Sequence, residues 1–340
     1  MDGSGPNADT VISSRVRLAR NLAEYPFPQR MSPAQAREVL ERIREAVAAV
    51  NRRANVGRLE IYDMSTLSAL DRQVLVEKHL ISPQHAEFKE GAGIVLRDDE
   101  AIAIMVNEED HLRIQCLAPG FDLDQSFEMS NLVDDEFETE VAYAYCYRRG
   151  YLTACPTNVG SAMRASVMMH LPALLITGRA GRVFSAITKV GTLVRGLYGE
   201  GTEAIGNLFQ ISNQISLGQS EVEIVENLKD VATQIVAEER NAREYLLKET
   251  RRQLEDRVAR AYGILSNARV ITSGETIKLW SDVKLGLELG ILESPSRRTL
   301  NELLVLTRPA FIQRLIGREL TPEERDEHRA ALIREKLKRT

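Results

Sequence analysis

The spacing of apolar residues changes its period along the chain and predicts both helices and strands in the first two-thirds. Ser32 and Pro33 match an N-cap and a proline at the first helical position, and behind them apolar residues recur at three- and four-residue steps as far as Val50. The same period recurs in three further segments, 70–80, 121–147 and 161–175. We expect Pro172 to kink the last of these helices.

Shorter apolar runs predict strands, and the clearest of them lie within 93–117. Two apolar runs flank the acidic turn 97–100 and predict a hairpin. A second acidic turn, 107–110, leads into a third predicted strand. Outside this region, strands are expected at 59–62 and 207–215.

The character of the chain changes near residue 220. The next forty residues are rich in Glu, Arg, Leu and Val, with no Gly or Pro before Gly263, which predicts one long helix or a tight pair. Further helical segments follow, and the last covers 322–339. The pattern therefore predicts an α+β domain over 1–220 and an all-α domain over 221–340.

Composition and charge exclude several classes of protein. Of the 340 residues 44% are hydrophobic and 27% charged, which excludes disorder as the main state. No apolar run reaches the roughly 18 residues of a membrane span, and no signal-peptide pattern opens the chain. The net charge of −5 argues against a nucleic-acid binder. Three cysteines make no disulfide framework, so we expect a cytoplasmic protein.

Arginine is strongly preferred over lysine. Lysine occupies nine positions, so the other 35 of the 44 basic residues are arginine. Codon bias explains such an excess, but arginine also offers a planar fork of donors that grips phosphate oxygens in pairs. The positions of the arginines decide between these explanations, and their number does not.

Familiar catalytic motifs do not account for the chemistry. The chain contains no G-x-x-x-x-G-K-[ST] loop and no protein-kinase H-R-D or D-F-G motif. The segment 199–204 fits a degenerate G-x-G-x-x-A but lacks a surrounding βαβ unit. The histidines and cysteines lack zinc spacing, and a pairing of Cys155 with His170 is more simply a coincidence of sequence.

Polar and charged groups concentrate instead in four short segments. These are 13–17, 107–113, 155–164 and 195–203. Taken singly, each has an ordinary explanation as a solvated turn, a strand arginine that extends to solvent, or a glycine-rich loop. Taken together, they supply arginines able to clamp a triphosphate, while Glu109 and Glu200 supply two carboxylates for a cationic group. The arginines are Arg15, Arg17, Arg113, Arg164 and Arg195.

Long strings in and around these segments carry a resemblance to a known family. They are SSRVRLARN, LVEKHLISP, NEEDHLRIQC, CPTNVG, RASVMMHLPAL and YGEGTEA with NLFQISNQISLG. The chain resembles the guanidino (phosphagen) kinases and is similar along almost its whole length to their bacterial, protein-arginine-directed branch. The resemblance implies a catalytic domain with an antiparallel sheet flanked by helices. One departure is GSAMR at 160–164 in place of the more usual GTGLR, from which we expect a slightly different turn at Ala162.

The resemblance also implies site residues and cofactors. The catalytic residues would be Glu109 as base, Glu200, and Cys155 as a reactive thiol, with an inert buried thiol as the alternative for Cys155. ATP would be the phosphoryl donor with Mg²⁺, and no protein side chain is assigned as a metal ligand. The implied ATP contacts are Ser13, Ser14, Arg15, Val16, Arg17, His79, Arg113, Arg164, Ala165, Ser166, Val167, Met168, Arg195, Gly196, Leu197, Tyr198, Gly199 and Glu200.

The chemistry explains why a guanidino kinase needs these groups. A guanidinium has a pKa above about 12 and is a poor nucleophile while it is protonated. Two carboxylates can aim one of its nitrogens at the γ-phosphorus, and one of them can take the proton. Arginines and Mg²⁺ then stabilise the charge on the transferring phosphoryl group.

The C-terminal region carries a second candidate site. By resemblance it serves in dimerisation and in binding phosphoarginine, with Arg325 facing the phosphate and Asp326 the guanidinium. The alternative for this motif is a salt-bridged helix face. Small-guanidino kinases carry an N-terminal helical domain that closes over the metabolite. Here SSRVR begins at residue 13, so we expect an open site that suits an arginine on a protein.

The sequence therefore predicts an ATP-dependent kinase that phosphorylates arginine side chains of proteins. By analogy its partners would be a zinc-binding activator protein, a stress-response repressor as client, and a Clp-type chaperone–protease that degrades marked clients. We expect a homodimer, without membrane or nucleic-acid partners. The alternatives are a kinase for a small guanidino compound and a non-catalytic phosphoarginine-binding adaptor.

Overall fold

A computed structural model describes residues 3–87, 90–196 and 204–338, and within these ranges eight strands pair into one antiparallel sheet. The order across the sheet is β2-β3-β4-β5-β1-β8-β10-β9. The strands are β1 (Val11–Arg20), β2 (Leu59–Asp63), β3 (Gly93–Arg97), β4 (Ile102–Val106), β5 (Leu112–Pro119), β8 (Met163–His170), β9 (Thr192–Gly196) and β10 (Leu208–Asn213). The strands predicted within 93–117 and at 59–62 and 207–215 are confirmed.

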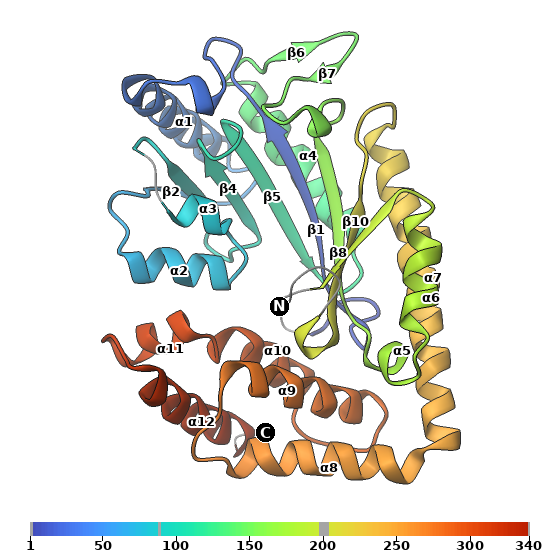
Figure 1. The fold of residues 1–340 in the computed structure, drawn as a ribbon. Helices are drawn as coiled ribbons and strands as arrows, with labels where there is room; N and C mark the ends of the chain where they lie inside the picture. Colours follow the sequence, from blue (N-terminus) through green and yellow to red (C-terminus); the bar gives the residue numbers. More distant parts are fainter. Residues whose placement is uncertain (1–2, 88–89, 197–203, 339–340) are drawn as a thin grey trace.

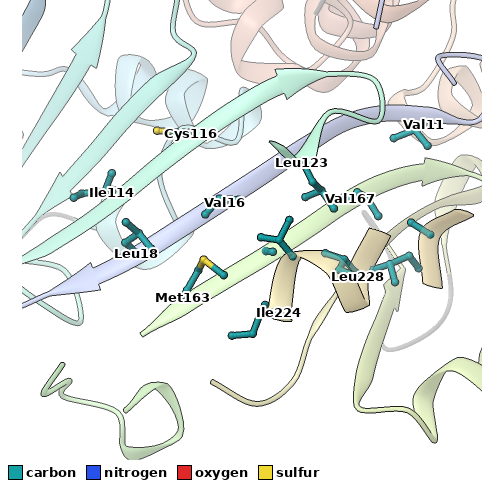
Figure 2. Close-up of a cluster of buried hydrophobic side chains, with 14 of the residues drawn as sticks. Val11, Val16, Leu18, Ile114, Cys116, Leu123, Met163, Val167, Ile224 and Leu228 are labelled. Carbon is teal, nitrogen blue, oxygen red and sulfur yellow. The ribbon is translucent and has the colours of Figure 1, made fainter. Parts of the chain in front are cut away.

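Helices cover one face of this sheet and build the main core (Figure 1). They are α1 (Pro33–Arg53), α4 (Leu123–Glu138) and α7 (Glu221–Glu249). The N-cap predicted at Ser32 is a full capping box with Gln35. Figure 2 shows Val16 and Leu18 of β1 in one apolar cluster with Met163 of β8 and Leu228 of α7. From Ser14 onward, alternation along β1 therefore directs its even-numbered side chains to the helix-covered face.

Two short helices cover part of the opposite face. The predicted helix over 70–80 is α2 (Ala69–Glu77), and it is followed by α3 (Pro83–Ala86). A small apolar core joins them to the far side of β3 and β4, where Ile94 and Met105 are buried. The rest of this face, over β5, β1, β8 and β10, carries polar side chains.

Two helix predictions are wrong. The segment 161–175 is strand β8 followed by α5 (Pro172–Ile176), and Pro172 starts the second element and kinks nothing. Strand β8 ends in apolar residues and is followed almost directly by the apolar helix α5, so the two elements together resemble one long helical segment. The helix predicted over 121–147 ends at Glu138, and its last residues form the hairpin of β6 (Tyr145–Cys146) and β7 (Gly150–Tyr151).

A helical region lies across one end of the sheet (Figure 1). The predicted long helix or pair is a pair, α7 and α8, which break at Thr250. The helices of this region that follow α7 are α8 (Arg251–Asn267), α9 (Ser273–Glu288), α10 (Arg297–Leu306), α11 (Pro309–Ile316) and α12 (Pro322–Lys338). Helix α6 (Ala180–Thr188) lies beside the sheet. The C-terminal helices share a core around Trp280, although α7 packs its apolar residues into the core of the sheet.

Polar contacts join the helical region to α2 and to the sheet. The Glu77 carboxylate at the end of α2 accepts the N–H groups of Ala310 and Phe311, each at 2.9 Å, and so caps α11. His170 of β8 and Ser281 of α9 form a buried hydrogen bond of 2.7 Å. Among the helices described, none combines the length and apolar character needed to cross a bilayer.

Candidate active site

The polar face of the sheet gathers arginines from neighbouring strands. Arg15 and Arg17 share this face of β1, as alternation predicts for an extended segment. Arg17 lies in register between Gln115 of β5 and Arg164 of β8. Arg113 is two residues from Gln115 on the same strand and therefore shares the face. Four arginines from three strands thus converge.

The next rows of the same face extend the polar surface. Arg15 is in register with Ser166 of β8, and Ser13 with Met168. Met168 is followed across the sheet by Gln210 of β10, and Gln210 by Arg195 of β9. Four predicted contacts have side chains on the other, helix-covered face: Ser14, Val16, Ala165 and Val167. Ser14, for example, donates to the Gly120 carbonyl oxygen at 2.9 Å.

Neutral groups orient the side chains of Arg15 and Arg164. Arg15 donates to the amide oxygens of Gln115 at 3.3 Å and Gln210 at 3.0 Å, and Arg164 to the Ser212 hydroxyl at 3.0 Å. The Nε atoms of Arg17 and Arg164 are buried without a hydrogen-bond partner. Within the described part of the chain, Arg15, Arg17 and Arg164 form no ion pair.

The electrostatic consequence is a set of cations that repel one another. Burial, reinforced by Arg113 and Arg164, lowers the pKa of Arg15 to about 10. Burial and the neighbouring arginines also hold the pKa of Arg17 well below its usual value. Buried, uncompensated charge is unfavourable unless an anion arrives to pair with it. The arrangement therefore suits a ligand with several negative charges.

The acidic turn after β4 is mostly structural. The side-chain amide of Asn107 donates to the carbonyl oxygens of Ala36 and Gly91, and Glu108 forms an ion pair of 2.8 Å with Arg113. The Asp110 carboxylate accepts the Asn21 amide at 2.6 Å and the Ala154 N–H at 2.7 Å. His111 Nδ1 accepts the Leu22 N–H at 3.0 Å. These contacts build a rigid support for the one residue of the turn that remains, Glu109.

Glu109 differs from its neighbours because its carboxylate has no hydrogen bond or ion pair to any described residue. Partial burial, with the negative charges of Asp110 and Glu108, raises its pKa. A raised pKa makes a carboxylate a better proton acceptor. Glu109 can therefore act as a general base toward a group that enters from solvent.

Two cavities place the predicted residues together. One of about 240 Å³ is lined by Glu109, Arg17, Arg113, Arg164 and Cys155. The Cys155 sulfur lies 3.0 Å from the Thr157 hydroxyl in this wall. A narrower cavity of about 30 Å³ is lined by five further residues of the predicted nucleotide site, Ser13, Arg15, His79, Ser166 and Met168.

Other predicted residues lie elsewhere. Leu197, Tyr198, Gly199 and Glu200 fall outside the described residues, whereas Arg195 and Gly196 end strand β9 and do not start a loop. Arg325 and Asp326 belong to α12 in the helical region. Arg164 lies in strand β8 and not in the helix predicted over 161–175. Ala162 adopts a φ of 51°, so this turn keeps the left-handed geometry without glycine.

Sequence reasoning missed the neutral residues of the site. Gln115, Gln210 and Ser212 orient Arg15 and Arg164. The signal for Gln115 was its position two residues beyond Arg113, which sets it on the same face of an extended strand. For Gln210 and Ser212 no such local signal exists, because the pairing of β10 with β8 joins segments about 45 residues apart.

The donor set fits a polyphosphate better than a metal ion bound by the protein alone. Among the described residues, no three His, Cys, Asp or Glu side chains gather into a metal-binding group. The unpartnered Nε atoms of Arg17 and Arg164, on a face with several arginines, match the oxygens of a nucleotide's phosphates.

Comparison with known families agrees with this chemistry. Residues 38–242 match the family model described as ATP:guanido phosphotransferase, C-terminal catalytic domain. Residues 251–340 match the model described as Protein-arginine kinase McsB C-terminal domain. The chain therefore belongs to the ATP:guanido phosphotransferase family.

Individual relatives indicate to which group of this family the chain is most similar. The chain is 54% identical over 337 residues to the protein-arginine kinase of Moorella thermoacetica, covering 99% of this chain and 96% of that one. It is 53% identical to that of Symbiobacterium thermophilum, with the same coverage. Within the family it groups with the protein-arginine kinases and is a kinase that acts on arginine.

Solved structures share the fold of the catalytic half. A lombricine kinase matches with a TM-score of 0.59 and 25% identity, over 71% of this chain and 68% of that one. The duplicated taurocyamine kinase of Schistosoma mansoni, with bound transition-state-analogue components, matches with a TM-score of 0.60 and 25% identity, over 70% of this chain and 34% of that one. The predicted antiparallel guanidino-kinase fold with a helical C-terminal region is confirmed.

Proposed function

We propose that this kinase transfers the γ-phosphoryl group of ATP to arginine side chains of proteins through the site on the polar face of the sheet. The observation that carries the proposal is the convergence of Arg15, Arg17 and Arg164, which form no ion pair with any described residue, beside the carboxylate of Glu109. The relatives named protein-arginine kinase support a protein as the acceptor.

In the proposed reaction, Glu109 and Glu200 hold the guanidinium of the target arginine. One guanidinium nitrogen attacks the γ-phosphorus in line, Glu109 takes the proton, and the bond between the γ-phosphorus and the oxygen of ADP breaks as the P–N bond forms. Arg15, Arg17, Arg113, Arg164 and Arg195 bind the phosphates. Mg²⁺, held mainly by the nucleotide, supplies further neutralisation of the phosphate charge. Cys155 stands beside the guanidinium as a reactive thiol.

The remaining predictions extend the proposal beyond the catalytic face. We propose a phosphoarginine site at Arg325 and Asp326, next to the buried Arg329. Asp326 pairs with Arg329, whose Nε donates to the Thr307 carbonyl oxygen at 2.7 Å. This pair joins Asp326 to a buried arginine, and the partly exposed Arg325 would supply the phosphate contact.

Partners and organisation are proposed on the strength of the family relationship. They comprise a homodimer in the cytoplasm, a zinc-binding activator protein, a stress-response repressor as client, and a Clp-type chaperone–protease. We further propose a two-domain division. Its boundary is predicted near 220, whereas the two family models separate between 242 and 251 and α7 packs against the sheet.

The proposed function is tested by incubating the protein with Mg·ATP and either an unfolded protein or free arginine. We expect mass spectrometry to find acid-labile phosphate on protein arginines, and a Glu109→Gln variant to lose activity by about 10³-fold. The Glu226→Gln variant, on the far side of the sheet, is the matched control. Phosphate on free arginine alone would assign a small-guanidino kinase, and full activity in Glu109→Gln would refute the mechanism.

A further inference from the structure

A second, larger cavity adjoins the catalytic one. Its volume is about 610 Å³, and Glu109 and Arg113 line both cavities. The Glu109 carboxylate therefore stands where the larger opening meets the pocket of arginines and Cys155. Cavities of 300 to 1,000 Å³ are typical of sites for whole ligands, so this one exceeds the needs of a single side chain.

The walls of this larger cavity are firmly held. Asn107 is fixed by the carbonyl oxygens of Ala36 and Gly91. His85 of α3 is buried and bonds the Gly93 carbonyl oxygen at 2.9 Å. The Gln29 side chain donates to the Glu109 carbonyl oxygen at 2.7 Å and so joins the opposite wall to the catalytic turn. A ligand would thus meet a preformed surface.

The rim of the cavity offers unused polar groups. The side chains of Gln84 and Glu87 are exposed and have no hydrogen bond or ion pair to any described residue. A primary amide can both accept a peptide N–H and donate to a peptide carbonyl, and the Gln29 amide oxygen is likewise available. Glu87, Glu108 and Glu109 make the lining acidic. Of these three carboxylates, Glu108 forms an ion pair with a described residue, Arg113.

We propose that this cavity, lined by Gln29, Gln84, Glu87 and Glu109, is the groove that binds the extended backbone on either side of the target arginine. Gln84 and Gln29 pair with the peptide backbone, and Glu87 favours segments with further basic residues. The inference rests on the proposed function, because it assigns the path by which a protein's arginine reaches Glu109.

The test compares two arginine-bearing peptides that differ only in flanking lysines or flanking glutamates. For the wild-type protein we expect a higher kcat/KM with lysine flanks. The Glu87→Gln variant should reduce this preference several-fold, and Glu87→Lys should reverse it. Gln84→Ala should raise the KM for either peptide by about fivefold, as loss of one hydrogen bond does, with kcat and the KM for ATP unchanged.

Matched controls separate the groove from general effects. Gln73→Ala, exposed on α2, and Glu226→Gln, exposed on α7, should leave the peptide KM and the flank preference unchanged. If Gln84→Ala and the Glu87 variants behave like these controls while the wild type phosphorylates both peptides, the groove is refuted and the function stands. If the wild type phosphorylates no arginine in any peptide or protein, the proposed function itself fails.

Discussion

Strand β1 holds arginines in opposite electrostatic environments at its C-terminal end and in its middle. At its end, the buried Arg20 donates through Nε and NH2 to Asp134 at 2.6–3.1 Å, and its guanidinium lies 3.5 Å from the centre of the Tyr151 ring. Burial alone would lower the pKa of Arg20, but Asp134 raises it. In the middle of the strand, Arg15 and Arg17 have lowered pKa values and form no ion pair with any described residue.

The difference separates arginines that stabilise the fold from arginines whose charge is compensated when a ligand binds. The structural kind recurs in the helical region, where Arg243 is paired with Asp9 and Glu239. Pairing within the chain satisfies a buried guanidinium permanently, whereas an unpaired one makes the folded protein less stable until a phosphate binds. Activity and stability should therefore respond in opposite ways when each kind is removed.

The largest expected effect comes from Arg17→Met. Arginines that stabilise a transferring phosphoryl group contribute about 10³-fold or more, so kcat should fall by at least about 10³. The same change removes an unpaired buried cation, and the free energy of unfolding should rise by about 1 kcal/mol. Steady-state kinetics and urea denaturation measure the two effects, and a loss of stability in Arg17→Met would break the comparison.

The counterpart is Arg20→Met, which leaves Asp134 buried without its partner. Breaking a buried pair from one side costs about 3–5 kcal/mol of unfolding free energy. Urea denaturation of the two methionine variants should thus give changes of opposite sign. A stability equal to the wild type would show that Arg20 is not structural.

A smaller effect is expected from His111, which lies two residues from Glu109 but belongs to the scaffold. Burial lowers the pKa of His111 to about 4. Between pH 6.5 and 4 the unfolded chain binds more protons than the folded one, so stability is fully present above 6.5 and is lost as the pH falls toward 4. His111 alone contributes up to about 3 kcal/mol to this loss.

The measurement is chemical denaturation at several pH values. A His111→Asn variant should show a shallower decline over that window than the wild type. Equal slopes in the wild type and His111→Asn would mean that this histidine is not buried in its neutral form.

Much of the fold follows from local pattern, and the exceptions have a common cause. The capped helix after Ser32 was predictable because one of its faces is buried and the other is polar. The hairpin of β3 and β4 was predictable because two continuous apolar runs flank a polar turn. Strand β8 was mistaken for a helix because its apolar end runs into α5 with only Leu171 between them, so the two elements form one long apolar segment. Where one element follows another without a polar turn, the spacing of apolar residues does not show where either ends.

For the site, the sequence alone determined the residue types, the shared face of Arg15 and Arg17, and the family resemblance carried by the NEEDH and CPTN strings. Only the tertiary structure decided that Glu109 is the member of its turn without a described partner. Ala36, Ser82 and Asn21, which bind the side chains of the other three residues of the turn, come from distant segments. Side-chain alternation is local and can be read along one strand. The choice of neighbouring strands, which brings Arg15, Arg17 and Arg164 together without ion pairs to described residues, is made by packing across the whole sheet.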